Sequence, residues 1–363
     1  MENKYVTQYP DLMVGKKIMY NHGFGSSASS GTVKLIRQTF PNASVVAYDI
    51  PLRPAEAMDM LREKAAVEKP DLIIGTSMGG MYTEMLYGYD RICVNPAFEM
   101  AHTMKEHGLT GRQLWQNPRQ DGETEFLVTK GLEKEYREVT ELCFKGLEAM
   151  DDVGLDQERR RVWGLFGDED NLVNTWDVYR AHYPQAVRFH GGHRMDDKSF
   201  LGGVVPVIRW IDDMQEGRER QIVYIDGSCL VEKGVMDSRA LSVPLSLLGE
   251  GVRPRASLQK AFKFLIEKYQ VYIVMPAPTN DRGEYAMTAS WIERYLSTPA
   301  HDHVVYTNRK QLLYGDFYID SQPTVSSTDG DDDAADGLLC TGIRLGSDDF
   351  KTWEEVITYF GRL

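Results

Sequence analysis

A serine between glycines follows a short apolar run in the first third of the chain and is a candidate nucleophile. Residues 75–80 are Gly-Thr-Ser-Met-Gly-Gly, so Ser77 stands in a G-x-S-x-G motif. Between a strand and a helix, this motif places the serine on a tight turn at the helix N-terminus. Side chains at Gly75 and Gly79 would crowd the turn, and helix N–H groups favour developing negative charge. A glycine-rich helix start without chemistry is the competing interpretation, and the flanking strand and helix disfavour it.

A serine nucleophile needs a base, and the base needs an acid that orients it. The expected chain order is serine, acid, histidine. After Ser77, the next strand-like run that ends in acids is 162–166, and the candidate acids that follow it are Asp168 and Asp170. The spacing G-x-x-D-x-x-V favours Asp170. His193 follows two glycines after another strand-like run, whereas His190 is expected to end that strand. The predicted triad is Ser77, Asp170 and His193, with Asp168 and His190 as rivals.

The oxyanion of an acyl-transfer intermediate needs two backbone N–H donors. One is expected from Met78, the residue after the nucleophile. The other is expected from the loop after an early strand, where residues 22–25 are His-Gly-Phe-Gly. Gly23 allows the chain to turn, so Phe24 is the better donor candidate. The predicted oxyanion hole is therefore formed by Phe24 and Met78.

Short apolar runs alternate with helical patterns up to about residue 211, which is typical of a parallel sheet covered by helices. A charged stretch at 102–161, predicted to be helical and most clearly so at 133–150, interrupts this alternation. It is either a cap over a site or a solvated helical excursion. A polar segment at 212–220 indicates a linker, and a second alternation follows it. In that second part Ser257 is expected to cap a helix at 257–268, and the acidic run at 326–333 is expected to be a solvated loop. We expect two α/β domains, at 1–214 with a helical cap at about 100–160, and at 221–363.

Four motifs together resemble the YqiA-like esterases, a family of small bacterial α/β-hydrolases. The motifs are YNHGFGSS at residues 20–27, YDIPLRP at 48–54, GTSMGG at 75–80 and GGHR at 191–194. The resemblance spans roughly residues 16–211. It implies the α/β-hydrolase fold and hydrolysis of carboxylic esters, with Ser77, Asp170 and His193 at the triad positions. The insertion before residue 161 departs from the plainest members of that family.

The second domain resembles the haloacid-dehalogenase-like superfamily, in particular its cytosolic 5′-nucleotidase branch, which implies a Rossmann-type α/β fold. The resemblance rests on WIERYL at residues 291–296 and TNRKQLLYGDFYID at 307–320. Such phosphatases carry two aspartates two residues apart after the first strand, then a Ser or Thr, a Lys and a late acidic pair. Lys310 matches the Lys, and Asp316 with Asp320 matches the pair.

The first motif of that phosphatase site is incomplete. In one register Asp226 is the second aspartate and Tyr224 takes the place of the nucleophile; in the other Asp226 is the nucleophile and Ser228 replaces the general acid. Met275 stands where Ser or Thr is expected. A tyrosine cannot form the acyl phosphate or offer Mg²⁺ a carboxylate. We expect a phosphate site at Asp226, Lys310, Asp316 and Asp320 that is at most weakly catalytic, with Mg²⁺ disfavoured by the missing aspartate.

Composition sets the remaining expectations. The 363 residues carry 41 Lys and Arg against 54 Asp and Glu, a formal charge of −13, which argues against nucleic acid or an anionic membrane as partner. The four cysteines are scattered without a zinc or disulfide pattern, which favours a reducing cytoplasm. We expect a cytoplasmic serine esterase for a small-molecule ester that needs no cofactor. A 5′-nucleotidase-like phosphatase, or a nucleotide-binding regulator with the hydrolase half as passenger, is the alternative, and an interaction protein without turnover is a third.

Overall fold

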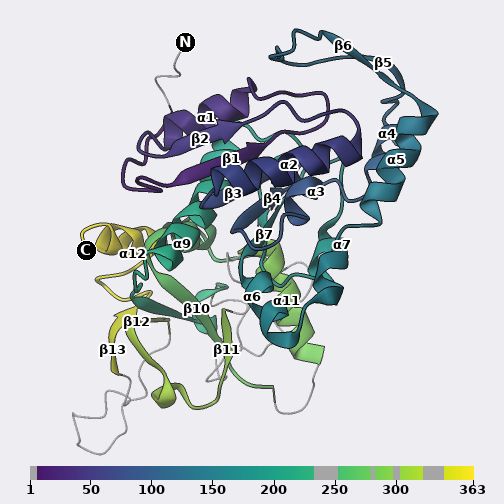
Figure 1. Ribbon diagram of the computed structural model, residues 1–363. Coiled ribbons are helices and arrows are strands. Elements are labelled where there is room, and N and C mark those ends of the chain that lie inside the picture. Colours follow the sequence, from purple (N-terminus) through teal and green to yellow (C-terminus); the bar gives the residue numbers. More distant parts are fainter. Residues whose placement is uncertain (1–5, 233–251, 279–282, 297–302, 322–338) are drawn as a thin grey trace, which may run out of the picture. The chain divides into compact units, whose positions relative to one another are not determined.

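The chain divides into two compact units after residue 216. The computed structural model describes residues 6–232, 252–278, 283–296, 303–321 and 339–363, and the units are Met1–Glu216 and Gly217–Leu363. Each unit contains a parallel sheet with helices packed against it (Figure 1). The predicted α/β class is confirmed.

Six parallel strands form the sheet of the first unit. They are β1 (Lys17–Asn21), β2 (Ser44–Ala47), β3 (Leu72–Thr76), β4 (Arg91–Val94), β7 (Val162–Gly167) and β8 (Ala186–Phe189). Their order is β2-β1-β3-β4-β7-β8, so β3 and β4 lie in the middle. All carboxyl ends of a parallel sheet meet at one edge, which is where ligands bind in open α/β sheets.

Helices cover both faces of this sheet (Figure 1). They are α1 (Gly31–Thr39), α2 (Pro54–Glu68), α3 (Met78–Glu84), α4 (Met100–Glu106), α5 (Lys130–Thr140), α6 (Asp152–Arg160), α7 (Trp176–Arg180), α8 (Asp197–Ser199) and α9 (Val205–Gln215), with a 3-10 turn at Lys145–Ala149 and a π turn at Phe200–Val204. Met19, Ile73 and Cys93 enter one apolar cluster with residues of α2 and α3. Their strand neighbours point to the opposite face, because strand side chains alternate.

The insertion between β4 and β7 is only partly helical. It contains α4, α5 and α6, but also an antiparallel hairpin of β5 (Gly111–Leu114) and β6 (Glu125–Val128). The helix expected at 133–150 ends at residue 140, and Phe144 adopts a left-handed backbone with φ of 65°. Phe126 and Val128 are buried and alternate with the exposed Glu125 and Leu127, so the strand has a period of two over only four residues.

The second unit has a five-stranded parallel sheet in the order β11-β10-β9-β12-β13. The strands are β9 (Ile222–Asp226), β10 (Gln270–Met275), β11 (Val304–Tyr306), β12 (Tyr314–Asp320) and β13 (Leu339–Arg344), and the helices are α10 (Leu258–Lys268), α11 (Gly283–Tyr295) and α12 (Trp353–Phe360), with 3-10 turns at Gly227–Cys229 and Lys310–Leu312. The core joins α10 and α12 to the central strands.

Two local expectations in this unit have different outcomes. Ser257 was expected to cap α10, but its backbone is left-handed with φ of 62° and its hydroxyl donates to Glu354 Oε1 at 2.9 Å. The capping prediction is wrong, because the side chain makes a tertiary contact instead. The acidic loop expected at 326–333 lies outside the described residues.

Candidate active site

The turn between β3 and α3 holds Ser77 in a strained backbone conformation. Its φ and ψ are 54° and −120°, in a region that few non-glycine residues adopt. The glycines beside it are required by space. A Cβ on Gly75 would lie 2.3 Å from the Gly79 carbonyl oxygen, and one on Gly79 would lie 2.1 Å from that of Asn21. The turn therefore presents Ser77 at the carboxyl edge of the sheet.

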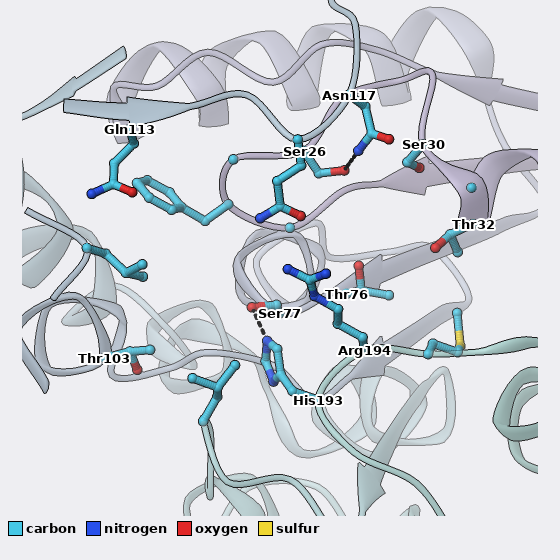
Figure 2. Close-up of a pocket in the computed structure, with 18 of the residues that line it drawn as sticks. Ser26, Ser30, Thr32, Thr76, Ser77, Thr103, Gln113, Asn117, His193 and Arg194 are labelled. Atoms are coloured by element: carbon cyan, nitrogen blue, oxygen red, sulfur yellow. Dashed lines mark hydrogen bonds between the residues drawn. The ribbon is translucent and has the colours of Figure 1, made fainter. Parts of the chain in front are cut away.

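Ser77, His193 and Asp170 form a continuous hydrogen-bond chain. The Ser77 Oγ lies 3.0 Å from His193 Nε2 (Figure 2). On the other side of the ring, His193 Nδ1 lies 2.8 Å from Asp170 Oδ2. The other carboxylate oxygen of Asp170 accepts from the backbone N–H groups of Leu172 and Val173 at 2.8 and 3.0 Å. The Asp170 side chain is only 2% exposed. The carboxylate is thus fixed, and it orients the imidazole toward the hydroxyl.

The rival candidates pair with each other. His190 Nδ1 lies 3.3 Å from Asp168 Oδ1, and both side chains are exposed. Asp168 Oδ1 also accepts from the backbone N–H of Gly191 at 3.0 Å. The geometry therefore separates two acid–histidine pairs, and only the pair with His193 reaches Ser77.

Asn95 positions the loops that carry the acid and the histidine, and sequence reasoning missed it. Its amide nitrogen donates to the carbonyl oxygens of Gly192 and His193 at 3.1 and 3.2 Å, and its Oδ1 accepts from the N–H of Gly167 at 2.7 Å. It lies directly after β4 at the carboxyl edge, with a left-handed φ of 44°. An Asn-Pro pair after an apolar run was the signal that could have found it.

The loop after β1 lies directly beside Ser77. A Cβ on Gly23 would lie 3.3 Å from Ser77 Cβ, so the two backbones approach closely. His22 fixes this loop: its Nδ1 bonds to the Gly23 carbonyl oxygen at 2.9 Å, and its Nε2 accepts from the N–H of Ile50 at 3.0 Å. Burial lowers the pKa of His22 to about 4, so the imidazole is neutral at neutral pH.

The Phe24 ring is held by the insertion. It packs edge-on against Phe126 and Tyr136, with centroids 5.3 and 5.9 Å apart. The Tyr136 hydroxyl in turn donates to the Leu52 carbonyl oxygen at 3.0 Å and lies 3.1 Å from Met78 Sδ. The insertion thus contacts the side chains of both residues whose amides were predicted to form the oxyanion hole.

A cavity of about 680 Å³ opens over Ser77 and His193 (Figure 2). Part of its wall is apolar and comes mainly from the insertion, with Met100, Leu109, Leu114, Phe126 and Leu172. Another part is polar and comes from Ser26, Ser30, Thr32, Gln116 and Asn117. The volume suits a small-molecule substrate.

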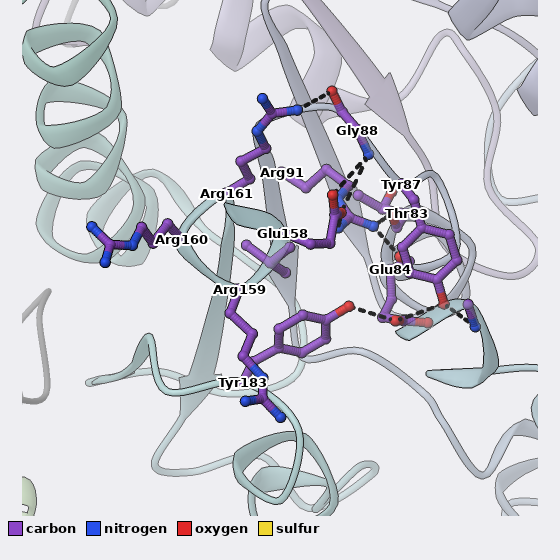
Figure 3. A network of polar contacts seen from close by, with 12 residues as sticks. Thr83, Glu84, Tyr87, Gly88, Arg91, Glu158, Arg159, Arg160, Arg161 and Tyr183 are labelled. Atoms are coloured by element: carbon purple, nitrogen blue, oxygen red, sulfur yellow. Dashed lines mark hydrogen bonds and ion pairs between the residues drawn. The ribbon is translucent and has the colours of Figure 1, made fainter. Parts of the chain in front are cut away.

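A buried ionic network anchors the end of α3, the helix that begins after Ser77 (Figure 3). Arg91 has no solvent exposure, and its guanidinium pairs with the Glu158 carboxylate of α6. It also donates to the carbonyl oxygen of Glu84, while Glu158 accepts from the N–H of Gly88 at 3.1 Å. No motif in the sequence singles out these charged residues.

The Glu84 side chain extends the network toward the insertion. Its carboxylate accepts from the hydroxyls of Tyr183 and Tyr87 at 2.8 and 3.3 Å and from the N–H of Phe144 at 3.1 Å. Burial raises the pKa of Glu84 above its usual range, while the nearby Arg91 lowers it. Core and insertion are therefore tied together at this point.

In the second unit, Asp226 and Lys310 form a direct ion pair. Lys310 Nζ lies 2.5 Å from Asp226 Oδ2, which also accepts from the Tyr318 hydroxyl at 2.7 Å. The other oxygen accepts from the N–H of Ser228 at 2.9 Å. Burial, followed by the Asp226 charge, raises the pKa of Tyr318 far above its usual range. Asp226 is therefore already well bonded.

The four residues predicted to share a phosphate site do not all meet. Asp226 ends β9 and Asp320 ends β12, so both lie at the carboxyl edge of the sheet. Asp316 lies four residues earlier on β12, roughly 13 Å away along the strand, and accepts from the N–H of Ile222 at the other edge. This placement corrects the predicted set by removing Asp316, because strand direction separates residues that are close in sequence.

Tyr224 also lies away from that edge. It is inside β9, and its hydroxyl donates to the Tyr314 carbonyl oxygen at 2.9 Å, at the start of β12. Met275 is buried at the end of β10, and its Sδ lies 2.6 Å from where a Cβ on Gly227 would be. Of the candidates for the first motif, only Asp226 offers a carboxylate at the edge.

The described residues do not fit a Mg²⁺ ion. Within the described ranges, no three His, Cys, Asp or Glu side chains gather as metal ligands. Asp226 is bonded to an ammonium, a phenol and a backbone N–H, whereas Mg²⁺ needs oxygens arranged around it.

Comparisons with known proteins found one family model and several related proteins. Residues 17–190 match the model of the Uncharacterised protein family (UPF0227), which lies within the first unit. A curated relative, the "Putative 5'(3')-deoxyribonucleotidase" of Vibrio phage KVP40, is 29% identical over 108 residues, which is 30% of this chain. The match spans 59% of that relative's own length.

Solved structures similar to the chain include the thioesterase domain from the curacin biosynthetic pathway and Est1E from Butyrivibrio proteoclasticus. The first is 16% identical, covers 51% of this chain and 87% of its own, and has a TM-score of 0.33. The second is 14% identical, covers 59% and 92%, and has a TM-score of 0.35. In the part of the chain that the structure describes, no helix is both long and apolar enough to cross a membrane.

Proposed function

We propose that the first unit is a serine hydrolase that cleaves carboxylic esters through an acyl-enzyme. The hydrogen-bond chain from Asp170 through His193 to Ser77 carries this proposal. Each member has a distinct role that its surroundings support: a strained, accessible hydroxyl, an imidazole within hydrogen-bond reach, and a buried carboxylate behind it.

In this mechanism Ser77 Oγ attacks the ester carbonyl carbon while His193 Nε2 accepts its proton. Asp170 holds the Nδ1–H and stabilises the imidazolium that forms. Collapse of the tetrahedral intermediate breaks the ester C–O bond, and His193 gives the proton to the departing alkoxide. A water molecule then attacks the acyl-enzyme with His193 as base, which releases the acid and restores Ser77.

The backbone N–H groups of Met78 and Phe24 are proposed to stabilise the oxyanion. Met78 follows Ser77 directly, and the close approach of Gly23 to Ser77 brings the loop with Phe24 beside it. A pair of such donors typically contributes about 10²–10³-fold per donor to turnover. Tyr136 and Phe126 of the insertion contact the Phe24 and Met78 side chains and so help to hold these two residues in place.

For the second unit we propose a phosphatase-like domain without efficient turnover. The Asp226–Lys310 pair supports this, because a carboxylate that is bonded to an ammonium is a weak nucleophile. The first motif also offers no second aspartate to act as the general acid. The competing proposal is a 5′-nucleotidase-like phosphatase, which the similarity to the phage protein favours.

Two matched pairs of variants test the esterase proposal. Asp170→Asn should lower kcat for a p-nitrophenyl ester by about 10⁴-fold, because the amide favours the wrong imidazole tautomer. Asp168→Asn should change it less than about twofold. His193→Ala should be nearly as damaging as Ser77→Ala, and His190→Ala should be mild. A reversed ranking in either pair would assign the chemistry to the exposed pair instead.

A further inference from the structure

An arginine and an aspartate, Arg194 and Asp197, line the cavity over Ser77. Arg194 directly follows His193, so the loop that delivers the base also delivers this cation. Figure 2 shows the Arg194 side chain extending into the cavity beside Ser77 and Thr76. Arg194 is therefore placed to contact a bound ester.

The Arg194 guanidinium is exposed and takes part in no ion pair or hydrogen bond within the described ranges. Other arginines of this unit are engaged: Arg91 pairs with Glu158, and Arg53 with Glu135. A cation that packs against a pocket without a protein partner is available to an anion from solution. Guanidinium groups bind carboxylates through two parallel N–H···O bonds.

The wall near this cation is hydrophilic. Ser26, Ser30, Thr32 and Asn117 contribute hydroxyl and amide groups, and Asn117 Nδ2 donates to Ser26 Oγ at 3.1 Å (Figure 2). The apolar wall is supplied mainly by the insertion, so the cavity offers one polar and one apolar surface to the two halves of an ester. A fully apolar ester would leave the polar surface unused.

We propose that Arg194 makes the pocket selective for esters that carry an anionic group, such as a carboxylate, on one side of the scissile bond. This inference rests on the proposed esterase function and adds the substrate class. Arg194 acts in binding, whereas Ser77 and His193 act in bond cleavage. The Asp197 carboxylate, three residues further along the chain, repels the same anion.

Two pairs of probes separate the two sides of the ester. Mono-p-nitrophenyl adipate against its neutral methyl ester places the charge on the acyl side, and 4-acetoxybenzoate against its methyl ester places it on the alcohol side. In each pair the measured quantity is the ratio of kcat/KM for the charged and neutral probes, divided by the ratio of their spontaneous hydrolysis rates. A charge-assisted hydrogen bond is typically worth about tenfold or more.

The expected result is a charged-to-neutral ratio above one in at least one pair. It should fall about tenfold in Arg194→Met, recover in part in Arg194→Lys, and rise in Asp197→Asn. Raising the salt concentration should lower the ratio, because the guanidinium is exposed. Arg62→Met, which removes an exposed arginine on α2, is the matched control and should leave the ratio unchanged.

Equal ratios in wild type and Arg194→Met for both pairs would overturn the proposal. A binding arm keeps this outcome separate from failure of the esterase function. In Ser77→Ala, calorimetry with 4-acetoxybenzoate and with mono-p-nitrophenyl adipate should detect binding of at least one probe that Arg194→Met weakens about tenfold. If no probe is hydrolysed and Ser77 is not labelled by a fluorophosphonate, the esterase proposal fails, and this arm alone decides on Arg194.

Discussion

Replacing Glu158 by Gln removes the carboxylate that faces the fully buried Arg91 but keeps an acceptor for the Gly88 N–H. Both charged side chains are almost completely buried, at 0% and 6% exposure. Breaking such a pair from one side typically costs about 3–5 kcal/mol, since the remaining charge stays buried and unpaired. Glutamine keeps the shape of the side chain, so we expect the free energy of unfolding to fall by about 3 kcal/mol, at the lower end of that range. For a unit of this size the melting temperature should fall by roughly 6–12 °C.

The matched control is Asp156→Asn on the same helix. Asp156 pairs with Arg160 one turn away, and both are exposed, so we expect at most about 0.5 kcal/mol. Urea unfolding and hydrogen exchange of peptides from α3 and α6 measure the two effects. Faster exchange should appear in α3 of Glu158→Gln, because the network anchors its C-terminal end. A loss below about 1 kcal/mol, or equal effects in the two variants, would refute the assignment of Arg91 and Glu158 as a coupled buried pair.

The remaining predictions concern pH and the second unit. His22 has a pKa of about 4 in the folded protein against an ordinary 6.5, so its contribution to stability is complete above pH 6.5 and is lost as pH falls toward 4, by about 3 kcal/mol. Urea unfolding at several pH values should show this loss in wild type and a smaller one in His22→Asn; identical pH profiles would contradict it. With Ser77→Ala silencing the first site, phosphate release from nucleotides and sugar phosphates with Mg²⁺ should be slow, and robust release that disappears in Asp226→Asn would establish a second activity.

The candidate catalytic residues of the first unit could be predicted because each lies at a recognisable position in the chain. Ser77 lies in a motif that needs glycines on both sides, and Asp170 and His193 each follow a strand. Chain order and strand ends therefore suffice to place them at one edge of a parallel sheet. Whether Phe24 supplies an oxyanion donor stays a prediction.

Residues that depend on long-range packing were not predictable in the same way. Nothing in the local sequence indicates that Arg91 and Glu158 are buried, because each is the other's partner and the two are 67 residues apart in the chain. Asp316 and Asp320 were predicted to share a site because they are close in the sequence. They lie toward opposite ends of the same strand, β12, so only Asp320 is at the carboxyl edge of the sheet. The hairpin of β5 and β6 was missed because each of its strands has only four residues, which is too short for the alternation to stand out.

The central claim is that Ser77 is an activated nucleophile, and active-site labelling tests it most directly. A fluorophosphonate probe forms a covalent bond with a serine whose hydroxyl is activated by a base, and mass spectrometry of the digested protein locates it. The account predicts modification at Ser77 in wild type, strongly slowed in His193→Ala and unchanged in rate in His190→Ala. Absence of labelling at Ser77, or labelling that is equally fast without His193, would contradict it.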